Sequence, residues 1–312
     1  MMCAHLVNPK IIIICGPTAL GKTSTAINLA GIFNGEIIGA DSMQIYRYMD
    51  IGTAKPTADE QSRVAHHMID VIDPDEHFNA KQFAEMAHEK IMKLYARSVT
   101  PFVVGGTGLY IKALVNGLFK AGRSDIRVRK RLKEQSRSYG LYFLYQKLSR
   151  HDPDTAARIH PNDAYRIIRA LEIYELTGKT MTAFQREHGF KDNRFRALKI
   201  GLHIDREVLY DRINHRVDAM IESGFLNEVK GLLDMGYSED LKSMQSIGYR
   251  HLVDFIKGRS SWDETLRTLK RDTRRYAKRQ LTWFKADPEM VWREPGQLEE
   301  IVWLIKNFLQ AE

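Results

Sequence analysis

The chain has 312 residues and is 44% hydrophobic, so it can bury one large domain, or a core that carries a smaller second unit. No apolar run approaches the ~20 residues of a membrane span, and no signal region precedes the first apolar segment, which predicts a cytoplasmic protein without a membrane partner. Two cysteines exclude a disulfide framework or a four-thiolate zinc site, whereas a net charge of +8 permits a polyanionic partner.

The first part of the chain alternates apolar strands with helical segments. Its run IIIIC (11–15) is continuous and mostly β-branched, which is typical of a strand buried on both faces of a parallel sheet. Strand–helix–strand repetition predicts an α/β fold, with a P-loop-type parallel sheet wound with helices. The elements expected after the first strand are strands at 36–40 and 101–106 and helices at 22–33, 80–97 and 108–115.

A change of pattern marks a second unit. The middle of the sequence is charged and helical, and helical packing is the favoured interpretation of Tyr139, Tyr142 and Tyr145. Alternating β-type sequence then returns, followed by mostly helical text. We therefore predict a helical insertion domain at 117–196 within a catalytic core formed by 1–116 and 197–312.

A glycine loop joins the first strand to the first predicted helix and fits the pattern G-x-x-x-x-G-K-[ST]. Glycines let the backbone wrap a diphosphate, and the helix N-terminus receives its charge. Lys22 would reach the terminal phosphate, and the Thr23 hydroxyl can hold Mg²⁺. The loop residues are Gly16, Pro17, Thr18, Ala19, Leu20, Gly21, Lys22 and Thr23.

Phosphate binding alone does not define the reaction. A hydrolytic ATPase or GTPase usually has a second apolar strand that ends in a metal-binding Asp. The candidate strands at 37–42 and 68–76 fit that pattern imperfectly. A small-molecule kinase therefore stays open, as does an enzyme whose donor carries its diphosphate as a leaving group.

Two further turns are expected at the same edge of the sheet as the glycine loop, because each follows a predicted parallel strand. Asp41 follows the second strand and could accept a proton from an incoming nucleophile, or else cap the next helix. The turn at 105–108 contains three glycines and Thr107, whose hydroxyl could meet a ligand.

Basic residues also gather at 123–137 and 267–280, which favours a nucleic-acid partner over two solvated helix faces.

Eight segments in this order resemble the bacterial tRNA dimethylallyltransferases, also called tRNA isopentenyltransferases. The glycine loop alone is unspecific, but the second, third and last segments are distinctive, and the resemblance extends over most of the chain. The segments are GPTALGKT (16–23), ADSMQIY (40–46), DIGTAKP (50–56), VVGGTGLYIKAL (103–114), RIHPNDAYRIIRALE (158–172), RVDAMIESGFLNEV (216–229), QSIGYR (245–250) and RDTRRYAKRQLTWF (271–284).

The resemblance implies transfer of a dimethylallyl group from dimethylallyl diphosphate to N6 of the adenosine on the 3′ side of the tRNA anticodon, giving N6-isopentenyladenosine and diphosphate. Asp41 would be the general base, because an adenine amine is a weak nucleophile that must lose a proton. Thr107 would orient the amine or the leaving diphosphate. The glycine loop, Arg216 and Mg²⁺ on Thr23 would stabilise the departing charge.

The implied partner is a tRNA anticodon stem-loop, which the insertion would clasp while the target base is flipped into the site. We expect a monomer. The residues at RNA-contacting positions of the family are Asp41, Ser42, Met43, Gln44, Thr107, Arg129, Tyr165, Arg166, Ile167, Ile168, Arg169, Gln245, Ser246, Ile247, Gly248, Tyr249 and Arg250.

Three other functions share parts of this pattern. A small-molecule kinase would use the same glycine loop, and a non-catalytic RNA-binding protein would keep the loop only as a relic. An adenylate isopentenyltransferase would use the same donor, but the long basic insertion disfavours it because a free nucleotide has no need of such a unit.

Overall fold

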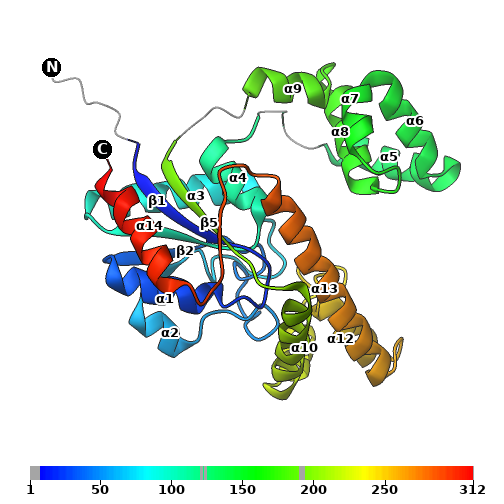
Figure 1. The fold of residues 1–312 in the computed structure, drawn as a ribbon. Coiled ribbons are helices and arrows are strands. Elements are labelled where there is room, and N and C mark those ends of the chain that lie inside the picture. Colours follow the sequence, from blue (N-terminus) through cyan, green and yellow to red (C-terminus); the bar gives the residue numbers. More distant parts are fainter. Residues whose placement is uncertain (1–7, 120–121, 123–124, 190–193, 312) are drawn as a thin grey trace. The chain divides into compact units, whose positions relative to one another are not determined.

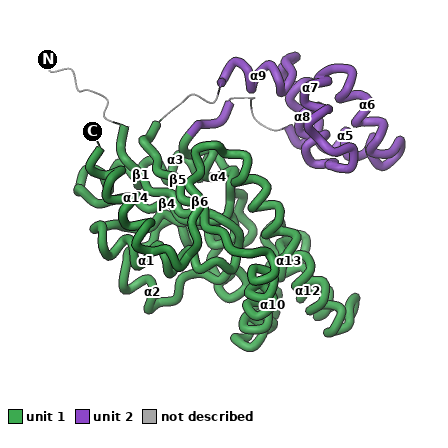
Figure 2. The backbone as a smooth tube through the Cα atoms, in the orientation of Figure 1, with its two compact units in different colours: residues 1–115, 193–312 green, residues 116–192 purple. Residues whose placement is uncertain are grey.

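The computed structural model describes residues 8–119, 122, 125–189 and 194–311, and the chain divides into two compact units (Figures 1 and 2). Unit 1 combines Met1–Val115 with Asn193–Glu312, and unit 2 is Asn116–Asp192. The predicted insertion, 117–196, shares most of its residues with unit 2. The first two residues of the basic segment at 123–137 lie outside the described residues.

A parallel sheet forms the centre of unit 1 (Figure 1). Within the described residues it has six strands in the order β3-β2-β4-β1-β5-β6, which confirms the predicted α/β fold. Parallel pairing brings the carboxyl ends of the strands to one edge, where α/β proteins bind ligands. The strands are β1 (Lys10–Cys15), β2 (Gly35–Gly39), β3 (His66–His67), β4 (Thr100–Gly105), β5 (Arg196–Leu202) and β6 (Val291–Arg293).

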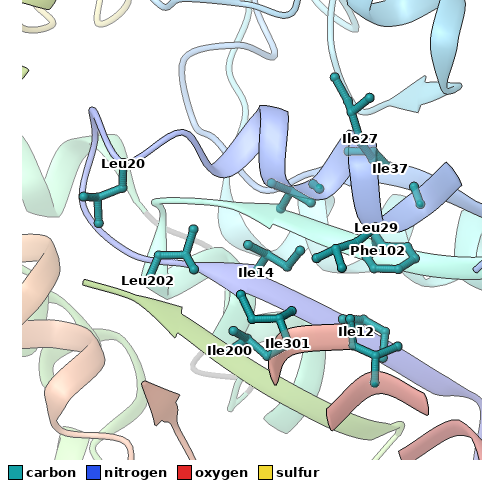
Figure 3. Packing of buried hydrophobic residues seen from close by; sticks show 14 of the residues in the cluster. Ile12, Ile14, Leu20, Ile27, Leu29, Ile37, Phe102, Ile200, Leu202 and Ile301 are labelled. Atoms are coloured by element: carbon teal, nitrogen blue, oxygen red, sulfur yellow. The ribbon is translucent and has the colours of Figure 1, made fainter. Parts of the chain in front are cut away.

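Helices pack against this sheet, and the residues of β1 from Ile11 to Cys15 are fully buried. On one face, Ile12 and Ile14 pack with Leu29 of α1 and Ile301 of α14 (Figure 3). A strand enclosed in this way has no wet face, so its sequence is apolar throughout instead of alternating. The helices of unit 1 are α1 (Lys22–Ile32), α2 (Ala58–Arg63), α3 (Ala80–Ala96), α4 (Gly108–Asn116), α10 (Arg206–Glu222), α11 (Phe225–Asp234), α12 (Tyr249–Ile256), α13 (Trp262–Lys285) and α14 (Leu298–Gln310).

Unit 2 is helical and has a separate hydrophobic core, in which Leu132, Leu144 and Leu148 pack with Leu171. Tyr139 and Tyr142 are 69% and 63% exposed, so the prediction that they pack in this core is wrong for both. Both lie on the outward faces of their helices, where aliphatic residues already fill the inner positions. The helices are α5 (Ile126–Tyr139), α6 (Leu141–His151), α7 (Pro153–Arg158), α8 (Ala164–Thr177) and α9 (Met181–His188).

A buried carboxylate connects α8 to α5 in unit 2. Glu172 has no exposed surface, and its Oε2 accepts hydrogen bonds from Arg129 Nη2 and Arg169 Nη1, both at 2.8 Å. Its Oε1 accepts the Asp125 N–H at 3.1 Å, just before α5 begins. A buried charge requires such partners, so these arginines stabilise the helical unit.

Across the described residues, none of the helices has the length and apolarity to cross a bilayer.

Candidate active site

The first glycine turn positions the start of α1 at the carboxyl end of β1. Gly16 has φ 138°, and a Cβ there would lie 2.6 Å from the Leu202 carbonyl oxygen of β5. Gly21, with φ 71°, precedes α1 and supplies no side-chain cap, so the first amides of the helix are left for an anion. Leu20 is buried in the core below the loop and anchors it (Figure 3).

A cavity of about 610 Å³ opens beside this turn, and all of its walls come from unit 1. Of the eight predicted loop residues, five line it, whereas Gly16, Pro17 and Leu20 are buried in the turn itself. The cavity therefore adjoins both the glycine turn and the segment after β2. The predicted site residues along its walls are Thr18, Ala19, Gly21, Lys22, Thr23, Asp41, Ser42, Met43, Gln44, Arg216, Gln245, Ser246, Ile247 and Gly248.

Two cations share this cavity. Lys22 Nζ donates a 2.7 Å hydrogen bond to the Pro17 carbonyl oxygen, within the loop. Burial, followed by the charge of Arg216, lowers the pKa of Lys22 to about 8, and Asp41 acts in the opposite direction. Burial also lowers the pKa of Arg216, again against the influence of Asp41. Two desolvated cations near one carboxylate form a site suited to an anion of more than one charge.

Asp41 stands at the end of β2 and faces the same cavity. Its Oδ1 accepts the Met43 N–H at 2.8 Å, and the neighbouring Ser42 N–H donates to Thr107 Oγ1 at 3.0 Å. Thr107 is not among the residues that line the cavity. Its hydroxyl accepts the Ser42 N–H and so holds the turn that carries Asp41, while the expected contact of Thr107 with a ligand stays a prediction.

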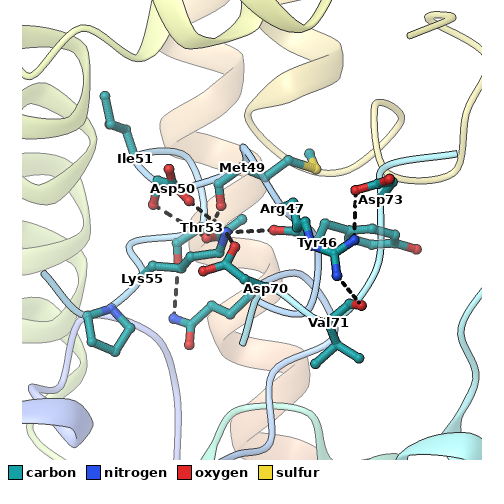
Figure 4. A network of polar contacts seen from close by, with 12 residues as sticks. Tyr46, Arg47, Met49, Asp50, Ile51, Thr53, Lys55, Asp70, Val71 and Asp73 are labelled. Atoms are coloured by element: carbon teal, nitrogen blue, oxygen red, sulfur yellow. Dashed lines mark hydrogen bonds and ion pairs between the residues drawn. The ribbon is translucent and has the colours of Figure 1, made fainter. Parts of the chain in front are cut away.

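The loop that follows Asp41 also contributes residues 52–55 to the cavity wall and is held by two polar networks. Lys55 Nζ, almost fully buried, donates to the Tyr46 carbonyl oxygen and to Asp50 Oδ1, both at 2.6 Å, and to Asp70 Oδ1 at 2.5 Å (Figure 4). Glu228 of α11 accepts the backbone N–H groups of residues 50, 51 and 52 at 2.9, 2.6 and 3.1 Å. These bonds fix the loop although it has no regular structure.

The segment 245–250 is also held from behind. The buried Tyr249 donates its hydroxyl to Glu228 Oε1 at 2.6 Å. Arg250 Nη2 donates to Asp272 Oδ2 at 2.7 Å, and His251 bridges Asp272 to the Gly248 N–H. Neither Tyr249 nor Arg250 lines the cavity. The side chain of Tyr249 is enclosed, so the structure gives no support to its predicted RNA contact. An RNA contact by Arg250 would compete with its ion pair to Asp272.

The predicted RNA residues of unit 2 fall into three groups. Tyr165 and Arg166 are exposed at the start of α8. Arg129 and Arg169 are partly exposed and also bind Glu172. Ile167 and Ile168 are buried in the core of the unit, which corrects their prediction as RNA-contacting side chains: their helical positions face inward.

The sequence prediction missed several residues of the cavity. Thr273, Tyr276 and Gln280 of α13 line it, together with Lys55 and others of the loop at 50–55. Burial, and then the charge of Asp41, raises the pKa of Tyr276, so its phenol stays protonated. The missed signal was the spacing: positions 273, 276 and 280 lie on one face of a helix within a segment already known to resemble the family.

A family model described as IPP transferase matches residues 44–287, most of the chain. The chain belongs to this family. It is 54% identical over 303 residues to the tRNA dimethylallyltransferase of Desulfosudis oleivorans. This alignment covers 97% of this chain and 96% of that protein. It is 51% identical to tRNA dimethylallyltransferase 2 of Syntrophus aciditrophicus over the full length of both.

Solved structures of IPP transferase relatives share the fold. The tRNA isopentenylpyrophosphate transferase of Bacillus halodurans superposes with a TM-score of 0.72 at 44% identity, covering 96% of this chain and 97% of that one. A eukaryotic dimethylallyltransferase acting on tRNA gives a TM-score of 0.78 at 30% identity, over 94% of this chain and 75% of that chain. The family predicted from the sequence is thereby confirmed.

Proposed function

We propose that this protein transfers a dimethylallyl group from dimethylallyl diphosphate to N6 of the adenosine on the 3′ side of the tRNA anticodon, releasing diphosphate. The observation that carries the proposal is one cavity that joins a phosphate-binding glycine turn to a carboxylate. The relatives named tRNA dimethylallyltransferase support the choice of donor and acceptor.

The glycine turn is the proposed cradle of the donor diphosphate. Its amides and the N-terminus of α1 receive the negative charge, and Lys22 and Arg216 approach from the cavity walls. Val217, Met220 and Leu269 give the cavity an apolar portion that suits a five-carbon isoprenoid group. As the carbon–oxygen bond breaks, charge accumulates on the diphosphate, and the two cations stabilise that charge.

Mg²⁺ fits this arrangement as an ion carried with the diphosphate. Such an ion needs one or two protein oxygens, with phosphate oxygens and water completing its shell. The Thr23 hydroxyl lines the cavity, while the described residues contain no cluster of three or more His, Cys, Asp or Glu side chains that would form a protein-only site. When bound, the ion would neutralise charge on the leaving diphosphate.

Asp41 is the proposed general base. The adenine N6 attacks the first carbon of the dimethylallyl group, a nitrogen–carbon bond forms, and the carbon–oxygen bond to the diphosphate breaks with its electron pair. The N6 proton passes to the Asp41 carboxylate, one oxygen of which is oriented by the Met43 N–H. Thr107 holds the adjoining Ser42 N–H and keeps this turn in place.

The acceptor is proposed to be a tRNA anticodon stem-loop, bound by a monomer in the cytoplasm. Ser42, Met43, Gln44 and residues 245–248 line the cavity and would contact the flipped base. Tyr165 and Arg166 of unit 2 are exposed and suited to stacking and phosphate contact, respectively. The test that follows separates this function from small-molecule phosphoryl transfer and from prenylation of free adenylate.

The test is incubation of the protein with unmodified tRNA and labelled dimethylallyl diphosphate, followed by nucleoside analysis. We expect label on the adenosine next to the anticodon and on no other nucleoside. Incubation with AMP in place of tRNA is the control for adenylate prenylation. Consumption of ATP without an isoprenoid donor, and without labelled tRNA, would instead favour the kinase.

A further inference from the structure

The side chain of Gln280 connects two glycine turns that belong to different strands. Gln280 lies on α13 and is 6% exposed. Its Oε1 accepts the Thr18 N–H at 3.0 Å, inside the phosphate-binding turn. Its Nε2 donates to the Gly106 carbonyl oxygen at 2.9 Å, in the turn after β4. A single amide therefore ties the donor cradle to the second turn.

Close approach at Gly106 makes this connection possible. A Cβ at position 106 would overlap Gln280 Nε2, so only glycine leaves room for the amide. The next glycine of the turn, Gly108, admits Trp283 of the same helix in the same way. Gly106 and Gly108 of the second turn thus serve contact with α13, besides any approach to a ligand.

The second turn in turn holds Asp41. Thr107 follows Gly106 directly, and its backbone N–H donates to the Ala40 carbonyl oxygen at 3.1 Å. Its hydroxyl accepts the Ser42 N–H at 3.0 Å. Asp41 lies between these two bonded residues. Two sets of hydrogen bonds, joined by the covalent backbone between Gly106 and Thr107, therefore connect the first glycine turn through Gln280 to both neighbours of Asp41.

We propose that Gln280 is a positioning residue that fixes the separation between the diphosphate cradle and Asp41. This inference rests on the proposed function, in which the reacting carbon and the amine proton must be presented to each other at these two turns. Reaction rates depend steeply on such placement: a displacement of about 1 Å can lower turnover ~100-fold. Gln280 would set this distance through Thr18 and Gly106, without contact to the reacting atoms.

Two substitutions separate the two bonds. Gln280→Met keeps a side chain of similar length and removes both bonds. Gln280→Glu keeps an acceptor for the Thr18 N–H but loses the donor to Gly106. Thr282→Ala, an exposed position on the same helix, is the matched control. Folded protein in each preparation is counted by the stoichiometry of pyrophosphate binding, and melting temperatures are recorded beside turnover.

We expect kcat per folded molecule to fall ~100-fold for Gln280→Met and ~10-fold for Gln280→Glu. KM for the donor and Kd for tRNA should stay within about threefold of the parent, because Gln280 is proposed to act through the two turns that it connects and not by binding either ligand. Thr282→Ala should match the parent. Turnover of both Gln280 variants within twofold of the parent, whatever their melting temperatures, would overturn the inference. Absence of prenylated tRNA from the parent reaction would instead overturn the proposed function.

Discussion

The two units use buried charge in different ways. In unit 2, the carboxylate of Glu172 is enclosed and bound by Arg129 and Arg169, so opposite charges are satisfied within the fold. In unit 1, burial lowers the pKa of both Lys22 and Arg216, and the charge of Arg216 lowers that of Lys22 further, beside a cavity that Asp41 also lines. Charge that is paired internally holds helices together, whereas charge that faces a cavity is held ready for a ligand.

Among the substitutions that test this comparison, Asp41→Asn should have the largest effect on turnover. The amide keeps the size of the side chain and can still accept the Met43 N–H, but it cannot take a proton. We expect turnover to fall at least ~100-fold, with tRNA and donor affinities nearly unchanged. Single-turnover prenylation and separate binding titrations measure the two quantities. Parent-level turnover would remove Asp41 from the mechanism.

Lys22→Met should weaken diphosphate binding by about 10- to 100-fold, the usual worth of a hydrogen bond to a charged group. The parent should also lose affinity for pyrophosphate as the pH rises through about 8, because Lys22 gives up its proton near that pH and its positive charge with it. Calorimetry between pH 7 and 9.5 measures both effects, because this pH range brackets the pKa of Lys22 of about 8.

The methionine variant supplies the control for this titration, since pyrophosphate itself changes charge over the same range. Its affinity should vary less with pH than that of the parent. The depressed pKa also predicts that the parent gains stability as the pH rises from about 8 toward 10.5, because the unfolded chain still binds the proton that folded Lys22 has released. Equal pH profiles for parent and variant would show that Lys22 does not titrate there.

Glu172→Gln should destabilise unit 2 by about 2 kcal/mol, less than a fully buried pair because both arginines are partly exposed. Hydrogen exchange in the peptides of α5 and α8 reports this unit separately from the sheet. Glu187→Gln removes an exposed ion pair with Lys179 and is the matched control, with an expected effect below ~0.5 kcal/mol. Faster exchange in the sheet would show that the units do not unfold independently.

Arg166→Ala should have the smallest effect. Arg166 is 59% exposed and near Asp163, so its loss should leave the fold intact and reduce the salt slope of tRNA binding by about 1. Arg129→Ala should weaken binding too, with added loss of stability through Glu172. Arg97→Ala is the control, because Arg97 follows α3 in unit 1 at the amino end of β4, whereas the cavity lies at the carboxyl ends of the strands. Identical slopes for Arg166→Ala and the parent would argue against a phosphate contact.

Local patterns were sufficient for the central strands β1, β2, β4 and β5 and for the first glycine turn, whereas the short outer strands β3 and β6 were not predicted. The apolar run of β1 and the spacing of α1 follow from burial and helical periodicity, and the loop between them has a fixed pattern of glycines. Asp41 could be placed at the cavity because parallel strands end at one edge. Arg216 was assigned only through the family resemblance, and the structure brings it to the same cavity.

Side-chain direction in helices was harder to predict. The segment Tyr165–Arg169 was assigned to RNA as a block, yet a helix turns consecutive residues to different sides, so Ile167 and Ile168 entered the core. The bond that the Thr107 hydroxyl accepts from the Ser42 N–H was likewise not predicted, because the two residues lie on different turns. The role of Glu228 was invisible because its partners lie in a loop far away in the chain.

The amino-acid sequence by itself determined the class of fold, the glycine turn after β1 and the family, because these depend on spacings within short segments. Only the tertiary structure decided which polar side chains face the cavity and which form hydrogen bonds that hold the surrounding loops in place. Gln280, Glu228 and Lys55 acquire their roles from partners brought close by folding. Hydrogen bonds act over a few ångströms of space, and the order of residues along the chain does not specify that proximity.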